Sequence, residues 1–217
     1  MLHQRLKQRY PDVPLCIMGH SMGSFLTRTY LIRYPGTVKA AVIMGTGWQP
    51  RAAITGGLAL ANAIAAVSGE NATSELVTEL AFGSYNKLFA PNRTKVDWLS
   101  ADESNVDDYI ADPLCGADAT VGLFRQMLHG IRFNQRQSHL RQMDREMPVL
   151  FVAGDKDPVG SCGKGVRQTY DAFRAAGMRD CTLKLYPGLR HEILNEKAYT
   201  ADITKNIEAW LLSRLEK

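Results

Sequence analysis

The stretch LCIMGHSMGSFLTRTYL, which begins at Leu15, constrains the fold of this chain more than any other. It overlaps "PLCIM", a continuous apolar run of the length that is typical of a buried parallel strand. From Met22 the apolar spacing becomes that of a helix, which Pro35 and Gly36 end. The residues expected near one face of this helix are Phe25, Leu26, Thr29 and Ile32. The sequence therefore predicts a strand, a sharp turn at Gly-His-Ser-Met-Gly, and a helix.

Three further apolar runs predict buried strands, with helical patterns between and after them. They are "VKAAVIMG" from Val38, "PVLFVAG" from Pro148 and "CTLKLYPG" from Cys181. A last helix is expected over about residues 199–215. Its expected inner residues are Ile203, Ile207, Trp210, Leu211 and Leu215. Strands that alternate with helices favour an α/β domain with a mainly parallel sheet.

About 100 residues separate the second and third predicted strands, far more than a crossover between parallel strands needs. This segment has helical patterns of its own, from the small-residue run around 52–67 to "VGLFRQMLHGIRF". We therefore expect a core made of residues 1–47 and 146–217, incomplete at its N-terminus, and a helical cap over residues 48–145, inserted between two strands.

Ser21 stands on the predicted turn, between two glycines. A tight turn from strand to helix holds the serine hydroxyl exposed at the carboxyl end of the sheet, where side chains in place of the glycines would clash. The N-terminus of the next helix points its free N–H groups and its positive dipole end at that hydroxyl. The turn thus favours a nucleophile at Ser21, with the Met22 N–H as an oxyanion donor.

A serine nucleophile needs a base, and the base needs an acid that orients it. The third strand ends in "AGDKDPVG", which places Asp155 and Asp157 at the same edge of the sheet as Ser21. The fourth ends in "YPGLRHEILNE", which places His191 on the following loop. The order Ser, Asp, His is the one expected on this architecture. We favour Asp157 over Asp155 because it lies further out on the loop, where Pro158 fixes the chain.

The other histidines fit the role of base less well, and each is expected to be a surface or core residue. They are His3, His20, His129 and His139.

These motifs resemble the α/β-hydrolase superfamily, and within it the bacterial lysophospholipase and monoacylglycerol lipase-like group, also labelled serine aminopeptidase-like. The resemblance rests on "GHSMGSF", "AGDKDPVG" and "YPGLRHEILNE", and on the cap phrases "FGSYNKLF" and "DWLSADESNVDDYIADPLCG". It implies Ser21 as nucleophile, Asp157 as orienting acid, His191 as general base and acid, and Met22 as one arm of the oxyanion hole. It implies no metal or cofactor.

The start of the chain departs from the family pattern. Members have several strands before the serine strand, including a His-Gly turn that supplies a second oxyanion donor, and no such turn precedes Pro14. The chain thus resembles the carboxyl-terminal two-thirds of a longer hydrolase. We expect "PLCIM" to lie at or near a sheet edge, self-association through that edge, and weakened activity.

The favoured function is hydrolysis of lipid-like carboxylic esters of the monoacylglycerol or lysophospholipid type, because the apolar run "ITGGLALANAIAAV" of the cap could line an acyl channel. Two alternatives stay open. One is an aminopeptidase-like peptidase, in which acidic cap residues hold a substrate ammonium; the other is a catalytically weak fragment or binding module. The acidic residues concerned are Asp102, Glu103, Asp107, Asp108 and Asp112.

Composition excludes several other classes of protein. The 45% hydrophobic and 22% charged residues are those of an ordinary globular domain, and the net charge of +4 comes from scattered Lys and Arg, which argues against a nucleic-acid partner. Four widely spaced cysteines without a Cys-x-x-Cys pair suggest reduced thiols in the cytoplasm. The most apolar run is shorter than the about 20 residues that span a bilayer, so no transmembrane segment is expected.

Overall fold

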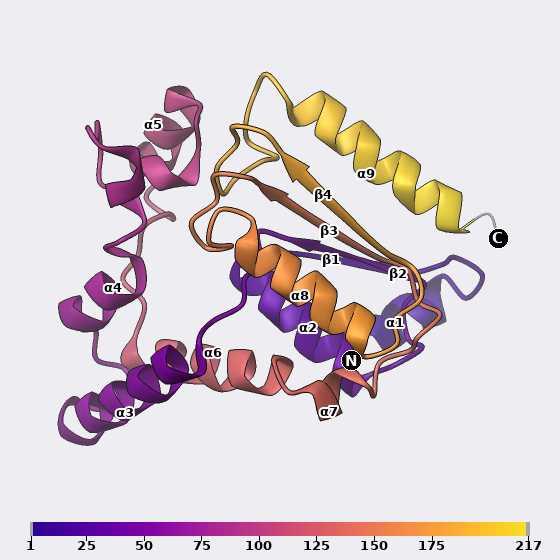
Figure 1. Cartoon of the computed structure of the whole chain (residues 1–217), viewed down its shortest axis with the longest axis horizontal. Coiled ribbons are helices and arrows are strands. Elements are labelled where there is room, and N and C mark those ends of the chain that lie inside the picture. Colours follow the sequence, from indigo (N-terminus) through magenta and orange to yellow (C-terminus); the bar gives the residue numbers. More distant parts are fainter. Residues whose placement is uncertain (1, 216–217) are drawn as a thin grey trace.

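The computed structural model describes residues 2–215, and its centre is a four-stranded parallel sheet (Figure 1). The strands are β1 (Cys16–His20), β2 (Ala40–Met44), β3 (Val149–Gly154) and β4 (Cys181–Tyr186), in the spatial order β1-β2-β3-β4. The registers pair Cys16 with Ala40, Ala41 with Val149, and Val149 with Cys181. The predicted α/β class with a mainly parallel sheet is confirmed.

Helices cover both faces of the sheet. Alternate residues of β2 and β3 point to opposite sides: Ile43 and Phe151 pack with α2 (Met22–Arg33) and α8 (Lys164–Ala175), and Val42 and Val152 pack with α9 (Thr200–Leu215). A further helix, α1 (Leu2–Arg9), precedes β1. Because β2 and β3 are buried on both faces, their sequences are continuous apolar runs rather than alternating ones.

One expectation about burial was wrong. "PLCIM" was predicted to be buried, but β1 has a single neighbouring strand within residues 2–215, and Met18 is 53% exposed. Leu26, grouped with Phe25 and Ile32 near one face of α2, is 61% exposed, while Leu31 and the charged Arg28 are buried. The expected position of β1 at a sheet edge is confirmed.

The helical elements between β2 and β3 lie beyond the carboxyl ends of the strands and along one side of the core (Figure 1). They are α3 (Arg51–Ser68), α4 (Glu75–Phe82), η1 (Asn86–Phe89), η2 (Asp97–Leu99), α5 (Glu103–Ala111), α6 (Val121–Asn134) and α7 (Gln137–Leu140). Packing of Phe25 in α2 against Ile54 and Leu58 in α3 and Ile131 in α6 joins these elements to the core. The inserted segment therefore stands over the edge of the sheet where Ser21 lies.

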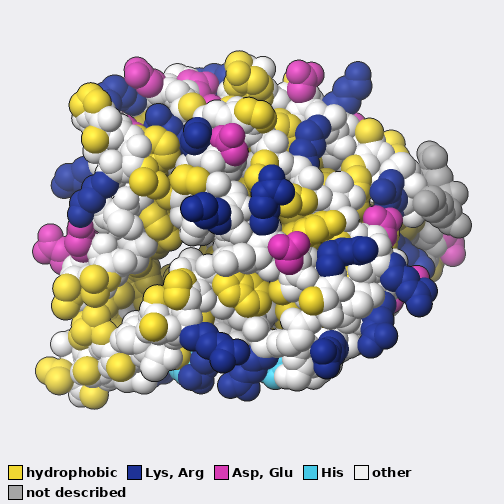
Figure 2. Space-filling view, viewed as in Figure 1, with side chains coloured by type: hydrophobic (Ala, Val, Ile, Leu, Met, Phe, Trp, Pro, Cys, Tyr) yellow, Lys and Arg dark blue, Asp and Glu magenta, His cyan; other side chains and the backbone are white. Residues whose placement is uncertain are grey.

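The first inserted helix, α3, is apolar along most of its length. With 18 residues and a mean hydropathy of 1.3, it is long and apolar enough to cross a membrane by those two criteria alone. Its buried residues Ile54, Leu58 and Ala61 pack inward. Hydrophobic side chains gather where α3 and α4 lie, at the lower left of the space-filling view (Figure 2).

Candidate active site

Ser21 occupies a strained turn between β1 and α2. Its φ of 55° and ψ of −122° are rare for a residue with a side chain and are sustained only when surrounding structure holds them. The turn is tight because Gly19 packs directly on α2: a Cβ there would lie 2.2 Å from the Gly23 carbonyl oxygen. As the first residue of α2, Met22 has an N–H without a helical acceptor. The turn therefore presents a hydroxyl and a free N–H together.

His191 and Asp157 form a buried pair. The Nδ1–H of His191 donates to both carboxylate oxygens of Asp157, at 3.0 Å each, and the two side chains are 2% and 0% exposed. Asp157 Oδ1 also accepts the N–H of Val159 at 2.9 Å. Within residues 2–215, His191 Nε2 is buried without a hydrogen-bond partner. The pair thus holds the imidazole with Nε2 free to accept a proton.

Asp155, the competing carboxylate, has a different environment. Its Oδ1 accepts the N–H of Gly188 at 2.8 Å, which closes the turn after β4. Asp155 therefore stabilises backbone, while Asp157 is the aspartate that contacts His191.

His20, the residue before Ser21, connects the turn at Ser21 to His191. Its Nε2–H donates to the carbonyl oxygen of His191 at 3.1 Å, and the two rings lie 4.6 Å apart. Burial, followed by the neighbouring charge of His191, lowers the pKa of His20. From sequence, His20 was expected to be a surface or core residue. Its position next to Ser21 was the one feature that could have indicated its contact with His191.

An apolar pocket of about 510 Å³ opens at Ser21 and Met22, between the core and the inserted helices. Its other lining residues include Phe25, Leu60, Phe82, Tyr85, Trp98, Phe124, Met127 and Val159. The Trp98 ring stacks on Phe82 and lies 5.2 Å from His191. Burial raises the pKa of Tyr85 to about 12, so its hydroxyl stays protonated at neutral pH. The volume falls in the range of small-molecule sites.

Hydrogen bonds fasten one part of the cap to the loop that carries His191, and we call this set the clasp. The Arg190 guanidinium donates to the carbonyl oxygens of Ser100, at 3.0 Å, and Asp97. The buried Glu196 carboxylate accepts the N–H groups of Ala101 and Asp102 at 2.8 and 3.1 Å. The clasp therefore fixes Trp98 relative to His191.

Arg28 is a buried cation on the helix that follows Ser21. Its Nη1 donates to the Gly47 carbonyl oxygen at 2.9 Å and to the Thr46 hydroxyl at 3.3 Å, and burial lowers the pKa of Arg28 to about 9. These bonds join α2 to the loop that leads into the cap. No pattern in the sequence indicated a charged residue at this buried position.

The acidic cap residues do not gather at the pocket, whose lining contains no carboxylate. Asp102 caps α5 through Ser104, Asp107 pairs with Arg93, and Asp108 pairs with Lys197. Within residues 2–215, no group of three or more His, Cys, Asp or Glu side chains could hold a metal ion.

Known proteins share both the sequence and the fold of this chain. The sequence profile of the family described as "Serine aminopeptidase, S33" matches residues 1–198. The chain belongs to this family. A monoacylglycerol lipase from Mycolicibacterium smegmatis is 31% identical over 95% of the chain and 65% of the relative. A monoglyceride lipase from Mus musculus is 26% identical over 97% and 62%, respectively.

The fold is that of solved α/β-hydrolases. The structure of a thermostable carboxyl esterase from Bacillus coagulans in complex with glycerol matches with a TM-score of 0.90 and 24% identity, over 98% of this chain and 68% of the esterase. The chain spans just under two thirds of the length of the two lipases. The predicted resemblance to the monoacylglycerol lipase-like group of α/β-hydrolases is confirmed.

Proposed function

We propose that this protein hydrolyses carboxylic esters of lipid-like substrates, of the monoacylglycerol or lysophospholipid type, through an acyl-enzyme on Ser21. The observation that carries the proposal is the buried His191–Asp157 pair, whose Nε2 lacks a partner and whose loop is bonded to the residue before Ser21. The pocket beside Ser21 is lined mainly by apolar and aromatic side chains, which suits an acyl chain. The similarity to two monoacylglycerol lipases supports a monoester substrate.

In the proposed reaction, Ser21 Oγ attacks the ester carbonyl carbon while His191 Nε2 takes the hydroxyl proton. The Met22 N–H donates to the carbonyl oxygen as it gains negative charge. The carbon–oxygen bond to the alcohol then breaks, and the imidazolium returns its proton to the leaving alkoxide. Water, deprotonated by the same nitrogen, attacks the acyl carbon; the bond to Ser21 Oγ breaks, Oγ takes the proton back from Nε2, and the carboxylic acid is released.

The carboxylate-free pocket lining favours an uncharged or acyl substrate over the ammonium group of an aminopeptidase substrate. A lysophospholipid shares the acyl ester of a monoacylglycerol and belongs to the same proposal. The four cysteines form no disulfide within the described residues, which agrees with the cytoplasmic location that we propose.

The test is labelling by a fluorophosphonate probe, together with turnover of a monoacylglycerol and an aminoacyl anilide. We expect labelling at Ser21 and turnover of the monoacylglycerol alone. Ser21→Ala and His191→Ala should each abolish both signals, and the double variant should lose no more than either single one, because the residues act as a unit. Labelling that persists in Ser21→Ala, or preferential anilide cleavage, contradicts the proposal.

A further inference from the structure

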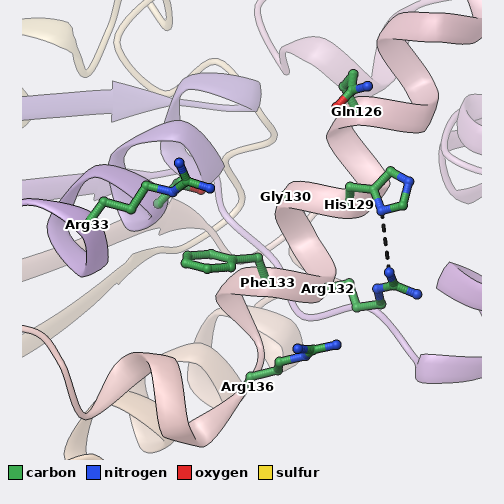
Figure 3. A pocket seen from close by; sticks show the side chains of 8 residues that line it. Arg33, Gln126, His129, Gly130, Arg132, Phe133 and Arg136 are labelled. Carbon is green, nitrogen blue, oxygen red and sulfur yellow. Dashed lines mark hydrogen bonds between the residues drawn. The ribbon is translucent and has the colours of Figure 1, made fainter.

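A second cavity, of about 360 Å³, lies between α2 and α6 outside the active-site pocket. Thr29 and Arg33 contribute from α2, and His129, Gly130, Arg132, Phe133 and other residues contribute from α6 and the residues after it (Figure 3). The opposite side of α6, with Phe124, Met127 and Ile131, lines the pocket at Ser21. One helix therefore separates two cavities of different chemistry.

The lining of this second cavity carries exposed arginines without a carboxylate partner. They are Arg33, Arg132 and Arg136, and no Asp or Glu is among the lining residues. None of the three arginines forms an ion pair within residues 2–215, whereas Arg93, Arg125, Arg179 and Arg214 each pair with an acidic side chain. Arg132 contacts His129 Nδ1, at 3.5 Å.

The floor of the cavity leaves room for a ligand. The Arg33 guanidinium lies 5.2 Å from the centre of the Phe133 ring. The centre of the His139 ring lies 4.2 Å from the centre of the same Phe133 ring. Gly130 presents no side chain, and a Cβ built at this position meets nothing within 4 Å. Figure 3 shows Arg33 extending from α2, Arg132 turned toward His129 on α6, and Arg136 extending from the segment that follows α6.

We propose that this cavity binds the phosphoryl group of a small phosphate ester. Guanidinium groups are planar forks of N–H donors that match phosphate oxygens two at a time, and they stay charged at every physiological pH. Three of them around one cavity without a carboxylate select an anion, and the volume suits a head group rather than an isolated ion. A soluble phosphate ester and a phospholipid head group both present this chemistry.

The site is distinct from the proposed ester hydrolysis, so binding is measured without turnover. Glycerol 3-phosphate is titrated by calorimetry against the 217-residue chain, and vesicles of phosphatidylglycerol or phosphatidylcholine are tested by co-sedimentation. The test variant is Arg132→Gln/Arg136→Gln. The matched control is Arg167→Gln/Lys205→Gln, which removes the same charge from residues that, like Arg132 and Arg136, are exposed and form no ion pair among the described residues. Thermal melts verify that all proteins are folded.

We expect saturable binding that weakens about 100-fold in the test variant, roughly tenfold for each guanidinium, and less than about threefold in the control. Binding of glycerol 3-phosphate identifies a soluble ester as the source, and binding of phosphatidylglycerol vesicles alone identifies a lipid head group; both support the site. Absence of binding to either probe overturns the proposal. Equal binding by the test and control variants, or equal binding to both kinds of vesicle, also overturns it.

Discussion

Replacing Asp157 by asparagine should disable the proposed base through its tautomer rather than through loss of structure. Asp157 Oδ1 accepts the Val159 N–H at 2.9 Å, and only the carbonyl oxygen of an asparagine can keep that bond. The amide nitrogen then takes the place of Oδ2, 3.0 Å from His191 Nδ1. The carbonyl oxygen also lies 3.0 Å from Nδ1, but an Nδ1–H would face the amide hydrogens at the same distance, which favours an accepting Nδ1 and moves the ring proton to Nε2.

With its proton on Nε2, the imidazole can no longer take the proton of Ser21. The triad template puts the cost of the wrong tautomer at about 10⁴ in kcat, or about 5 kcal/mol of barrier. KM should change little, because Asp157 is buried and does not line the pocket. The melting temperature should fall only modestly, since the bond to Val159 is retained.

The matched control lies two residues away. The Gly188 N–H donates to Asp155 Oδ1 at 2.8 Å, a bond that the carbonyl oxygen of Asp155→Asn can still accept, and no contact with His191 is involved. We expect kcat within about threefold of the parent. The assay is hydrolysis of a chromogenic acetate ester over a pH range, with circular dichroism to verify folding. Retention of more than a tenth of kcat by Asp157→Asn, or an equal loss in Asp155→Asn, refutes the tautomer argument.

Three other predictions concern the pocket, the turn and His20. Leu60→Lys places an ammonium in the pocket lining, so turnover of long-chain esters should fall at least about tenfold more than turnover of acetate esters. The control Leu60→Met should change turnover of neither ester. Gly19→Ala pushes a Cβ against the Gly23 carbonyl oxygen and should abolish folding as judged by thermal melts, while Gly23→Ala, with nothing within 4 Å, should be tolerated. The lowered pKa of His20 means that the unfolded chain binds a proton there first, so the free energy of unfolding falls as the pH drops below 6.5. In His20→Gln the melting temperature should fall less steeply as the pH drops below 6.5. An unchanged pH profile of the melting temperature contradicts this prediction.

The sequence predicted those parts of the fold that depend on local pattern. β2 and β3 are continuous apolar runs, and the Gly-His-Ser-Met-Gly turn has no regular strand or helix spacing, so both could be recognised from a few neighbouring residues. Both aspartates could be placed near Ser21 because a parallel sheet collects the carboxyl ends of its strands at one edge, and Asp157 was favoured because it lies further out on the loop, beside Pro158. The contact between Asp157 and His191 spans 34 positions, yet the topology alone brings them together.

Features that depend on packing between distant segments were not predictable. Arg28 is buried because the loop after β2 lies over it, and a lone arginine on a helix is normally read as exposed. Glu196 is buried because the backbone N–H groups of residues 101 and 102 meet it across 95 and 94 positions. Arg33 shares a cavity with Arg132 although about a hundred residues separate them, and neither position has a local pattern.

The clasp divides the cap into a part that can be exchanged and a part that cannot. Residues 97–102 are bonded to the loop of His191, so any rearrangement there disturbs the base itself. Residues 51–82 line the pocket and make no hydrogen bond to that loop among the described residues. Libraries that aim to change the acyl preference should therefore randomise residues 51–82 and keep residues 97–102 intact. Random recombination across position 97 should yield many folded but inactive chains.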